Sequence, residues 1–146
     1  MTIWFDMDGT IADLYGVENW LDYLIAEDVK PYAEAKPLVN LSRLARYLNR
    51  LQKAGYNLGV ISWLSKCGTD DYNAEVSAVK CEWLAKHLPS VKWDCVNITK
   101  YGVNKWETCG EGILFDDETQ NRTKWGGKSY EPCQIFEILK NLAEGA

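Results

Sequence analysis

Four acidic side chains stand directly after two separate apolar runs of the chain. Asp6 and Asp8 form an Asp-x-Asp-Gly-Thr pattern after the first run, and Asp116 and Asp117 follow a later one. If these runs are neighbouring strands, four carboxylates share one crevice, where two unit charges ~4 Å apart repel by ~4 kcal/mol at an effective dielectric of ~20. Such a cluster needs a cation or shifted pKa values. Oxygen ligands with room for water and phosphate are typical of Mg²⁺.

Two further polar residues take similar positions. Ser62 follows an apolar run, and Lys105 lies shortly before the run that precedes Asp116. Open parallel sheets bind ligands outside the carboxyl ends of their strands. Aspartates at strand ends also serve as turn residues and helix caps. The combination of both acidic pairs with a hydroxyl and a lysine favours a functional site.

Apolar patterning predicts the elements that position these groups. Short continuous apolar runs predict buried strands at residues 2–5, 58–61, 95–98 and 113–115, with a weaker fifth at 129–131. Spacings of three and four predict helices whose inward faces carry Val17, Trp20, Leu21 and Leu24; Leu41, Leu44, Leu48 and Leu51; Val76, Val79, Trp83 and Leu84; Ile135, Ile138, Leu139 and Leu142. We expect Asn40 to be the N-cap of the second of these helices. The alternation predicts an α/β fold with a parallel sheet covered on both faces.

Length and composition indicate one globular domain over residues 1–146. Of the 146 residues, 47% are hydrophobic and 25% charged, and the net charge of -5 excludes a broad basic field for nucleic acid or anionic lipid. No apolar run approaches the ~20 residues that cross a bilayer. Five cysteines without a C-x-x-C pair argue against a disulfide framework, and a single histidine excludes a two-histidine metal site. We expect a cytoplasmic protein.

The first two predicted strands lie about 50 residues apart, more than the ~30 of a whole βαβ unit. An additional element must therefore occupy residues 15–37, and we expect a flap or minimal cap over the strand ends. A small cap leaves an open site, which suits a large substrate or a lid donated by another subunit.

Four segments carry a family resemblance. Phe5-Asp6-Met7-Asp8-Gly9-Thr10, Val60-Ile61-Ser62, Lys105 and Leu114-Phe115-Asp116-Asp117 resemble, in order, the four motifs of the haloacid dehalogenase (HAD) superfamily of phosphohydrolases. The spacing is also similar to that of cytosolic-type 5'-nucleotidases and small HAD-like proteins of phages and bacteria. The resemblance implies a Rossmann-like α/β/α sandwich, with strand order 3-2-1-4-5, that hydrolyses a phosphomonoester with Mg²⁺.

The resemblance also implies a role for each motif residue. Asp6 would be the nucleophile that forms an aspartyl-phosphate, and Asp8 the general acid and then the general base. Ser62 would donate a hydrogen bond to a phosphoryl oxygen. Lys105 would offset negative charge, with Lys100 as the alternative for this role.

The same motifs supply the expected metal ligands. A carboxylate oxygen of Asp6, the backbone carbonyl of Asp8 and a carboxylate of Asp116 would bind Mg²⁺. Asp117 would bind through water or orient the other ligands, although either aspartate of this pair is a candidate for the direct ligand.

The expected substrate is a phosphorylated small molecule or a nucleotide, with nucleic acid only as a phosphorylated end and no membrane partner. Tyr15, Trp20, Tyr23, Trp63 and Trp106 lie near the motifs and are candidates for stacking a base, although we expect Trp20 in the core. The competing hypotheses are a catalytically silent Mg²⁺-binding module and a phosphoacceptor receiver domain. The third predicted strand ends at Thr99-Lys100 without an aspartate, which disfavours the receiver.

Overall fold

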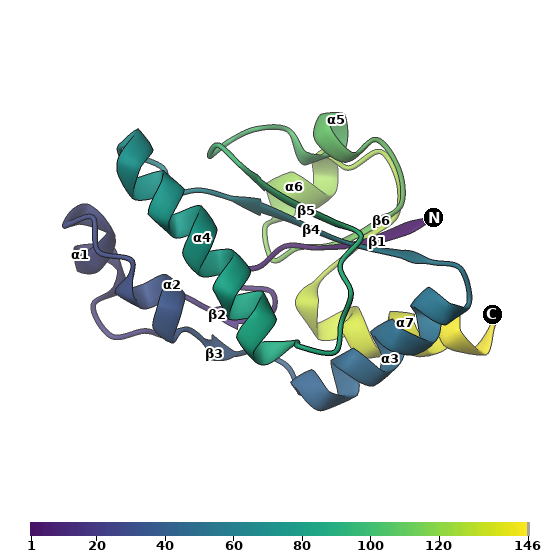
Figure 1. Cartoon of the computed structure of the whole chain (residues 1–146). Coiled ribbons are helices and arrows are strands. Elements are labelled where there is room, and N and C mark those ends of the chain that lie inside the picture. The colour runs from purple at the N-terminus through teal and green to yellow at the C-terminus, as the bar shows by residue number, and fades with distance from the viewer. Residues whose placement is uncertain (146) are drawn as a thin grey trace.

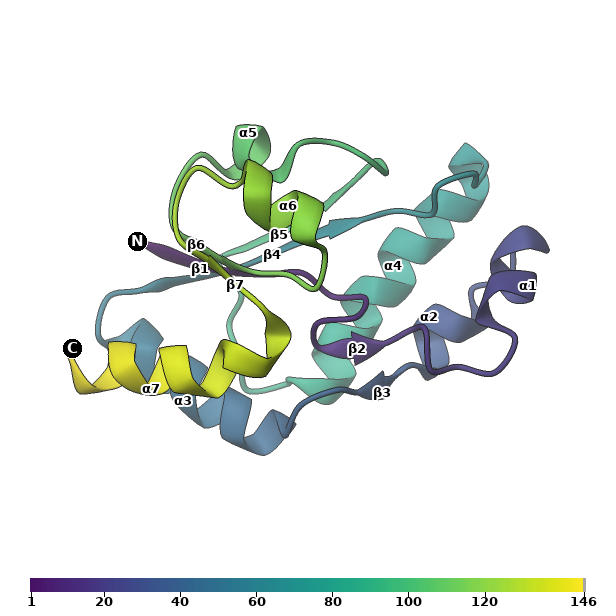
Figure 2. The same ribbon diagram turned by 180° about the vertical axis from the view of Figure 1, so that it is seen from behind.

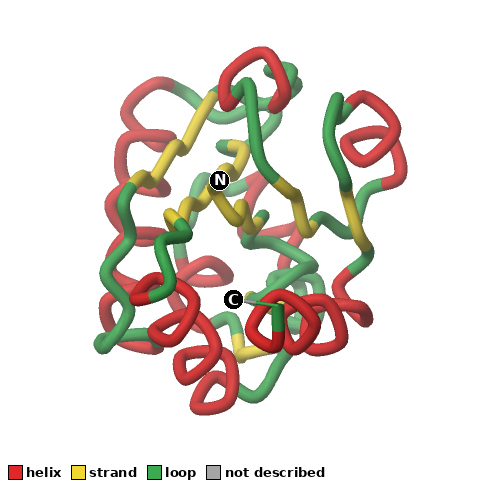
Figure 3. The backbone as a smooth tube through the Cα atoms, turned by 90° about the vertical axis from the view of Figure 1, so that its right-hand side faces the viewer, coloured by secondary structure: helices red, strands yellow, loops and turns green. Residues whose placement is uncertain are grey.

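A five-stranded parallel sheet forms the centre of the molecule in the computed structural model, which describes residues 1–145 (Figures 1 and 3). Its strands are β1 (Thr2–Phe5), β4 (Asn57–Trp63), β5 (Cys95–Thr99), β6 (Ile113–Phe115) and β7 (Ser129–Tyr130). The order across the sheet is β5-β4-β1-β6-β7. Counted along the chain, this is the predicted order 3-2-1-4-5. The structure is therefore an α/β fold of the predicted class.

Helices cover both faces of this sheet (Figures 1 and 2). One face carries α3 (Leu41–Lys53), α4 (Asp70–His87) and α7 (Ile135–Glu144), whose first residue follows a 3₁₀ turn over Pro132–Gln134; the other carries α5 (Lys105–Cys109) and α6 (Thr119–Lys124). Strand residues alternate between these layers. Ile3 and Phe5 pack with side chains of α3, α4 and α7, whereas Trp4 packs with Trp106 and Trp125. Within residues 1–145, no helix has the length and apolarity to span a membrane.

Local sequence determines where the long helices begin. Asn40 is the N-cap of α3, as predicted, because its side chain accepts a hydrogen bond of 3.0 Å from the Arg43 amide. Thr69 caps α4 in the same way. The strands agree with prediction at β1 and β6, but β4 continues through Trp63. Ser62 therefore lies inside a strand and not after its end.

The segment between β1 and α3 contains the predicted insertion. It consists of β2 (Ala12–Asp13), α1 (Trp20–Ile25), α2 (Lys30–Glu34) and β3 (Lys36–Pro37), with β2 and β3 paired antiparallel. The expectation of a helix with a buried face from Val17 to Leu24 was wrong. Helix α1 has only six residues, none of them buried, because its apolar side chains face a cavity and solvent and not the core.

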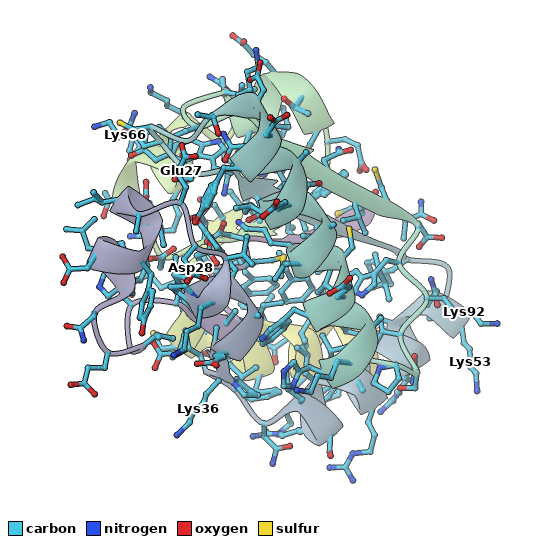
Figure 4. All side chains as sticks on the ribbon, turned by 60° about the vertical axis from the view of Figure 1, so that its left-hand side comes forward. Glu27, Asp28, Lys36, Lys53, Lys66 and Lys92 are labelled. Carbon is cyan, nitrogen blue, oxygen red and sulfur yellow. The ribbon has the colours of Figure 1, made fainter. Side chains whose placement is uncertain are left out.

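Two contacts hold this segment against the start of α4. The Glu27 carboxylate accepts hydrogen bonds from the Thr69 amide at 3.1 Å and the Thr69 hydroxyl at 2.9 Å. The Asp28 carbonyl accepts a bond of 2.8 Å from the Tyr72 hydroxyl. Figure 4 shows Glu27 and Asp28 where the segment of α1 and α2 meets α4. The insertion is thereby connected to the same helix that covers the sheet.

Candidate active site

The two acidic pairs converge at the carboxyl edge of the sheet, as the sequence predicted. Strands β1 and β6 are neighbours, with Phe5 opposite Phe115, and the Asp6 amide donates a hydrogen bond of 2.9 Å to the Phe115 carbonyl. One carboxylate oxygen from each of Asp6, Asp116 and Asp117 lies within 4.8 Å of the others. Residues more than a hundred positions apart thus form one anionic centre.

Lys105 is the cation at this centre. Its Nζ lies 2.9 Å from Asp6 Oδ1 and 2.7 Å from Asp116 Oδ2, and the side chain is buried. Burial disfavours the ammonium form, but the charges of Asp6 and Asp116 outweigh burial and raise the pKa of Lys105 above its usual value. Lys100, the alternative lysine, is exposed after β5. The geometry favours Lys105 for the predicted charge-offsetting role.

Thr10 connects the first and last motifs. Its buried hydroxyl donates to Asp6 Oδ2 at 3.0 Å and accepts from the Asp117 amide at 3.2 Å. The turn that brings Thr10 back to Asp6 passes through Gly9, whose φ of 82° is in the left-handed region that favours glycine. The Asp-Gly-Thr sequence therefore orients the Asp6 carboxylate and links the end of β1 to the end of β6.

Asp8 has a different environment from the other three carboxylates. Its Oδ2 lies 2.7 Å from the Nζ of Lys80, a side chain only 1% exposed. The Lys80 ammonium also donates to Ser62 Oγ at 2.8 Å and to the Trp63 carbonyl at 2.7 Å. Ser62 is fully buried. The structure thus links the Ser62 hydroxyl to Asp8 through a lysine that the sequence analysis missed.

A signal for Lys80 was present in the sequence. Lys80 lies four residues after Val76 and three before Trp83, so a charged residue interrupts the apolar stripe of α4. A second missed residue, Asn121, lies on α6 and donates to Asp116 Oδ2 at 3.1 Å. Asn121 had no comparable signal, because α6 was not predicted.

Burial raises the pKa of three carboxyl groups in the site. For Asp116 and Asp117, burial is the largest cause and the neighbouring Asp6 charge adds to it. For Asp8, burial raises the pKa while the Lys80 ammonium opposes the shift. Protons therefore bind these groups more readily than they bind free aspartate, unless a cation takes their place.

The donor set fits a divalent cation. Asp6, Asp116 and Asp117 offer three carboxylate oxygens in one cluster, and hard oxygen ligands of this kind suit Mg²⁺. Asp8 is absent from this set of carboxylates because its side chain bonds to Lys80. With its side chain bonded to Lys80, Asp8 would offer only its backbone carbonyl to the cation, which is the ligand predicted from the sequence.

A cavity of about 450 Å³ opens over Asp6, Asp8, Lys105 and Asp116. Two aromatic pairs are among the residues that line it. Tyr15 packs edge-on against Trp20, with ring centroids 4.9 Å apart, and Trp63 packs against Tyr101 at the same distance. Trp20 therefore lines the cavity and does not lie in the core as expected. Glu27 and Lys66, labelled in Figure 4, also line the cavity.

The comparisons with known proteins give remote similarity to solved structures alone. No protein-family model matches the chain, and no curated protein matches it. Among solved structures, the chain is similar to the D,D-heptose 1,7-bisphosphate phosphatase from Burkholderia thailandensis. The identity is 14%, the TM-score 0.48, and the alignment covers 84% of this chain and 69% of that chain.

Proposed function

We propose that this protein is a Mg²⁺-dependent phosphatase that hydrolyses a phosphomonoester through an aspartyl-phosphate on Asp6. The observation that carries the proposal is the convergence of Asp6, Asp116 and Asp117, the first two of which bind Lys105. Asp8 lies two residues from the nucleophile. A cluster of buried like charges is costly unless it binds a cation or an electrophile. A divalent ion would supply the cation, and the phosphoryl group that it holds would supply the electrophile.

The chain's own residues account for each step. Asp6 attacks phosphorus, and the bond to the leaving oxygen breaks while Asp8 gives that oxygen its proton. Water then attacks the phosphorus of the aspartyl-phosphate, Asp8 accepts the water proton, and the Asp6 carboxylate leaves. Lys105 offsets charge on the nucleophile and on the phosphoryl oxygens. When bound, Mg²⁺ would be held by Asp6, the Asp8 carbonyl, Asp116 and Asp117, and would polarise the phosphoryl group.

Ser62 bonds to a side chain of the protein and does not face the cavity. Its hydroxyl is buried and accepts a hydrogen bond from Lys80. Ser62 is also not among the residues that line the cavity over Asp6. In this arrangement, the contact from Ser62 to the site runs through Lys80.

The cavity favours a substrate with a flat apolar part. Tyr15, Trp20, Trp63 and Tyr101 present aromatic surface beside the carboxylates, and aromatic side chains stack bases without sequence preference. We propose a nucleotide or a phosphorylated nucleic-acid end as the substrate. The predicted cytoplasmic location is consistent with such a substrate and stays a prediction.

The test measures hydrolysis of p-nitrophenyl phosphate with and without Mg²⁺, by the wild-type protein and by Asp6→Asn. Asp71→Asn, the same change at an exposed position of α4, is the matched control. We expect Mg²⁺-dependent turnover in the wild type and the control, and none in Asp6→Asn with its melting temperature kept. A wild type without turnover would indicate the silent or receiver-like alternative. Turnover by Asp6→Asn would exclude Asp6 as the nucleophile.

A further inference from the structure

Two buried lysines contact the site, and their bonding differs. Lys80 places three acceptors around its ammonium: Asp8 Oδ2 at 2.7 Å, Ser62 Oγ at 2.8 Å and the Trp63 carbonyl at 2.7 Å. An ammonium group has three N–H donors. All three are therefore used by the protein, and none remains for a phosphoryl oxygen.

Lys105 keeps a donor for the substrate. It bonds to two carboxylates, Asp6 and Asp116, and its side chain lines the cavity. Lys80 does not line the cavity. Lys105 can therefore contact a phosphate in the cavity, whereas Lys80 cannot, because it has no free donor and does not line the cavity.

The bond from Lys80 also distinguishes the two oxygens of Asp8. Oδ2 is occupied by Lys80, whereas Oδ1 has no hydrogen-bond partner among residues 1–145, and Asp8 itself lines the cavity. A carboxyl group that transfers a proton needs one oxygen held and the other directed at the reacting atom. Asp8 has one oxygen held by Lys80 and leaves the other free at a residue that lines the cavity.

Stability alone does not explain a lysine at this position. Position 80 continues the inward face of α4 between Val76 and Trp83, where an apolar side chain would pack without desolvating a charge. Replacing buried ion pairs by apolar residues is often neutral or stabilising. The Lys80 ammonium also lies over the Tyr32 ring, 5.2 Å from the ring centroid. This contact further restricts where the ammonium can lie.

We propose that Lys80 is a positioning residue: anchored by Ser62 and the Trp63 carbonyl, it holds the Asp8 carboxylate so that Oδ1 exchanges the proton with the leaving oxygen. This role rests on the proposed phosphatase function. It also assigns a task to the buried Ser62 hydroxyl, which keeps Lys80 at the distance from which it reaches Asp8.

The role gives a leaving-group signature that general structural damage does not. p-Nitrophenolate leaves without a proton, whereas the alkoxide of glycerol 2-phosphate needs one. In Lys80→Met, we expect kcat/KM for glycerol 2-phosphate to fall at least ~10-fold further than kcat/KM for p-nitrophenyl phosphate, because general acid catalysis contributes ~10²–10⁴-fold. Lys105→Met should lose similar factors on both substrates, since Lys105 contacts the nucleophile.

A double variant tests whether Lys80 acts through Asp8. Asp8→Asn should show the same leaving-group preference, and Asp8→Asn combined with Lys80→Met should be no slower than Asp8→Asn alone. If Lys80→Met does not fold, Ser62→Ala removes one anchor of Lys80 and should shift the preference in the same direction. Melting temperatures establish which variants are folded.

The outcomes separate the two proposals. Equal losses on both substrates in Lys80→Met, or additive losses in the double variant, would overturn the positioning role and leave the phosphatase assignment intact. An unchanged leaving-group preference in folded Ser62→Ala would overturn the role if Lys80→Met is unfolded. If the wild type hydrolyses neither p-nitrophenyl phosphate nor glycerol 2-phosphate in the presence of Mg²⁺, both proposals are overturned.

Discussion

Gly9 lies against the Asp117 carboxylate, and a methyl group at this position tests whether Asp117 contributes to cation binding. A Cβ at Gly9 would lie 2.7 Å from Asp117 Cγ, with Oδ2 closer still. Gly9→Ala must therefore displace the Asp117 carboxylate. Gly55 supplies a matched control, because its φ of 104° is also left-handed but a Cβ there meets nothing within 4 Å.

The two substitutions share a backbone cost and differ in the clash. A left-handed conformation costs an L-residue ~1–2 kcal/mol, offset by ~0.4–1 kcal/mol from a less flexible unfolded chain. Gly55→Ala should thus lose about 1 kcal/mol of unfolding free energy, or ~2–4 °C in melting temperature for a chain of this size. Gly9→Ala should lose more, because Asp117 must also move.

Thermal unfolding with and without Mg²⁺ measures the difference. A ligand at 100 times its Kd stabilises by ~2.7 kcal/mol, and a tenfold weaker Kd reduces this to ~1.4 kcal/mol. We expect the Mg²⁺-induced stabilisation to fall by half or more in Gly9→Ala and to be unchanged in Gly55→Ala. Equal Mg²⁺ stabilisation in both variants would refute the participation of Asp117 in the cation site.

Two further predictions concern the cation and pH. Treatment with EDTA should abolish p-nitrophenyl phosphate hydrolysis and added Mg²⁺ should restore it; full activity in metal-free buffer would remove the cation from the mechanism. The raised pKa values of Asp8, Asp116 and Asp117 mean that the folded protein binds more protons than the unfolded chain above pH ~4. The metal-free protein should therefore lose stability as pH rises from 5 to 8, by up to ~1.4 kcal/mol per pH unit for each excess proton, and Mg²⁺ should reduce the loss. A melting temperature that rises over this interval without Mg²⁺ would contradict the shifts.

Much of the sheet could be predicted because its signals are local. The apolar runs of β1 and β6 are short, continuous and followed at once by aspartates, so their ends were correct. Asn40 shows its capping role by residue type alone. The convergence of both acidic pairs followed from one topological rule, that parallel strands share their carboxyl edge.

The features that could not be predicted depend on tertiary contacts, which the periodicity of apolar residues does not reveal. The spacing of Trp20, Leu21 and Leu24 indicates a helix face, but it is the same whether that face meets the core or a cavity. Lys80 sits on an inward stripe, and its partners Asp8, Ser62 and Trp63 lie 72, 18 and 17 residues earlier in the chain. The short helices α5 and α6 have too few residues for a periodic signal.

Covalent phosphorylation of Asp6 can be detected by acid-quenched mass spectrometry of the protein during turnover. Wild-type protein mixed with Mg²⁺ and p-nitrophenyl phosphate should carry one phosphoryl group on the peptide that contains Asp6, and Asp6→Asn should carry none. Rapid turnover without any modified Asp6 peptide, or a phosphoryl group on another residue, would contradict the account.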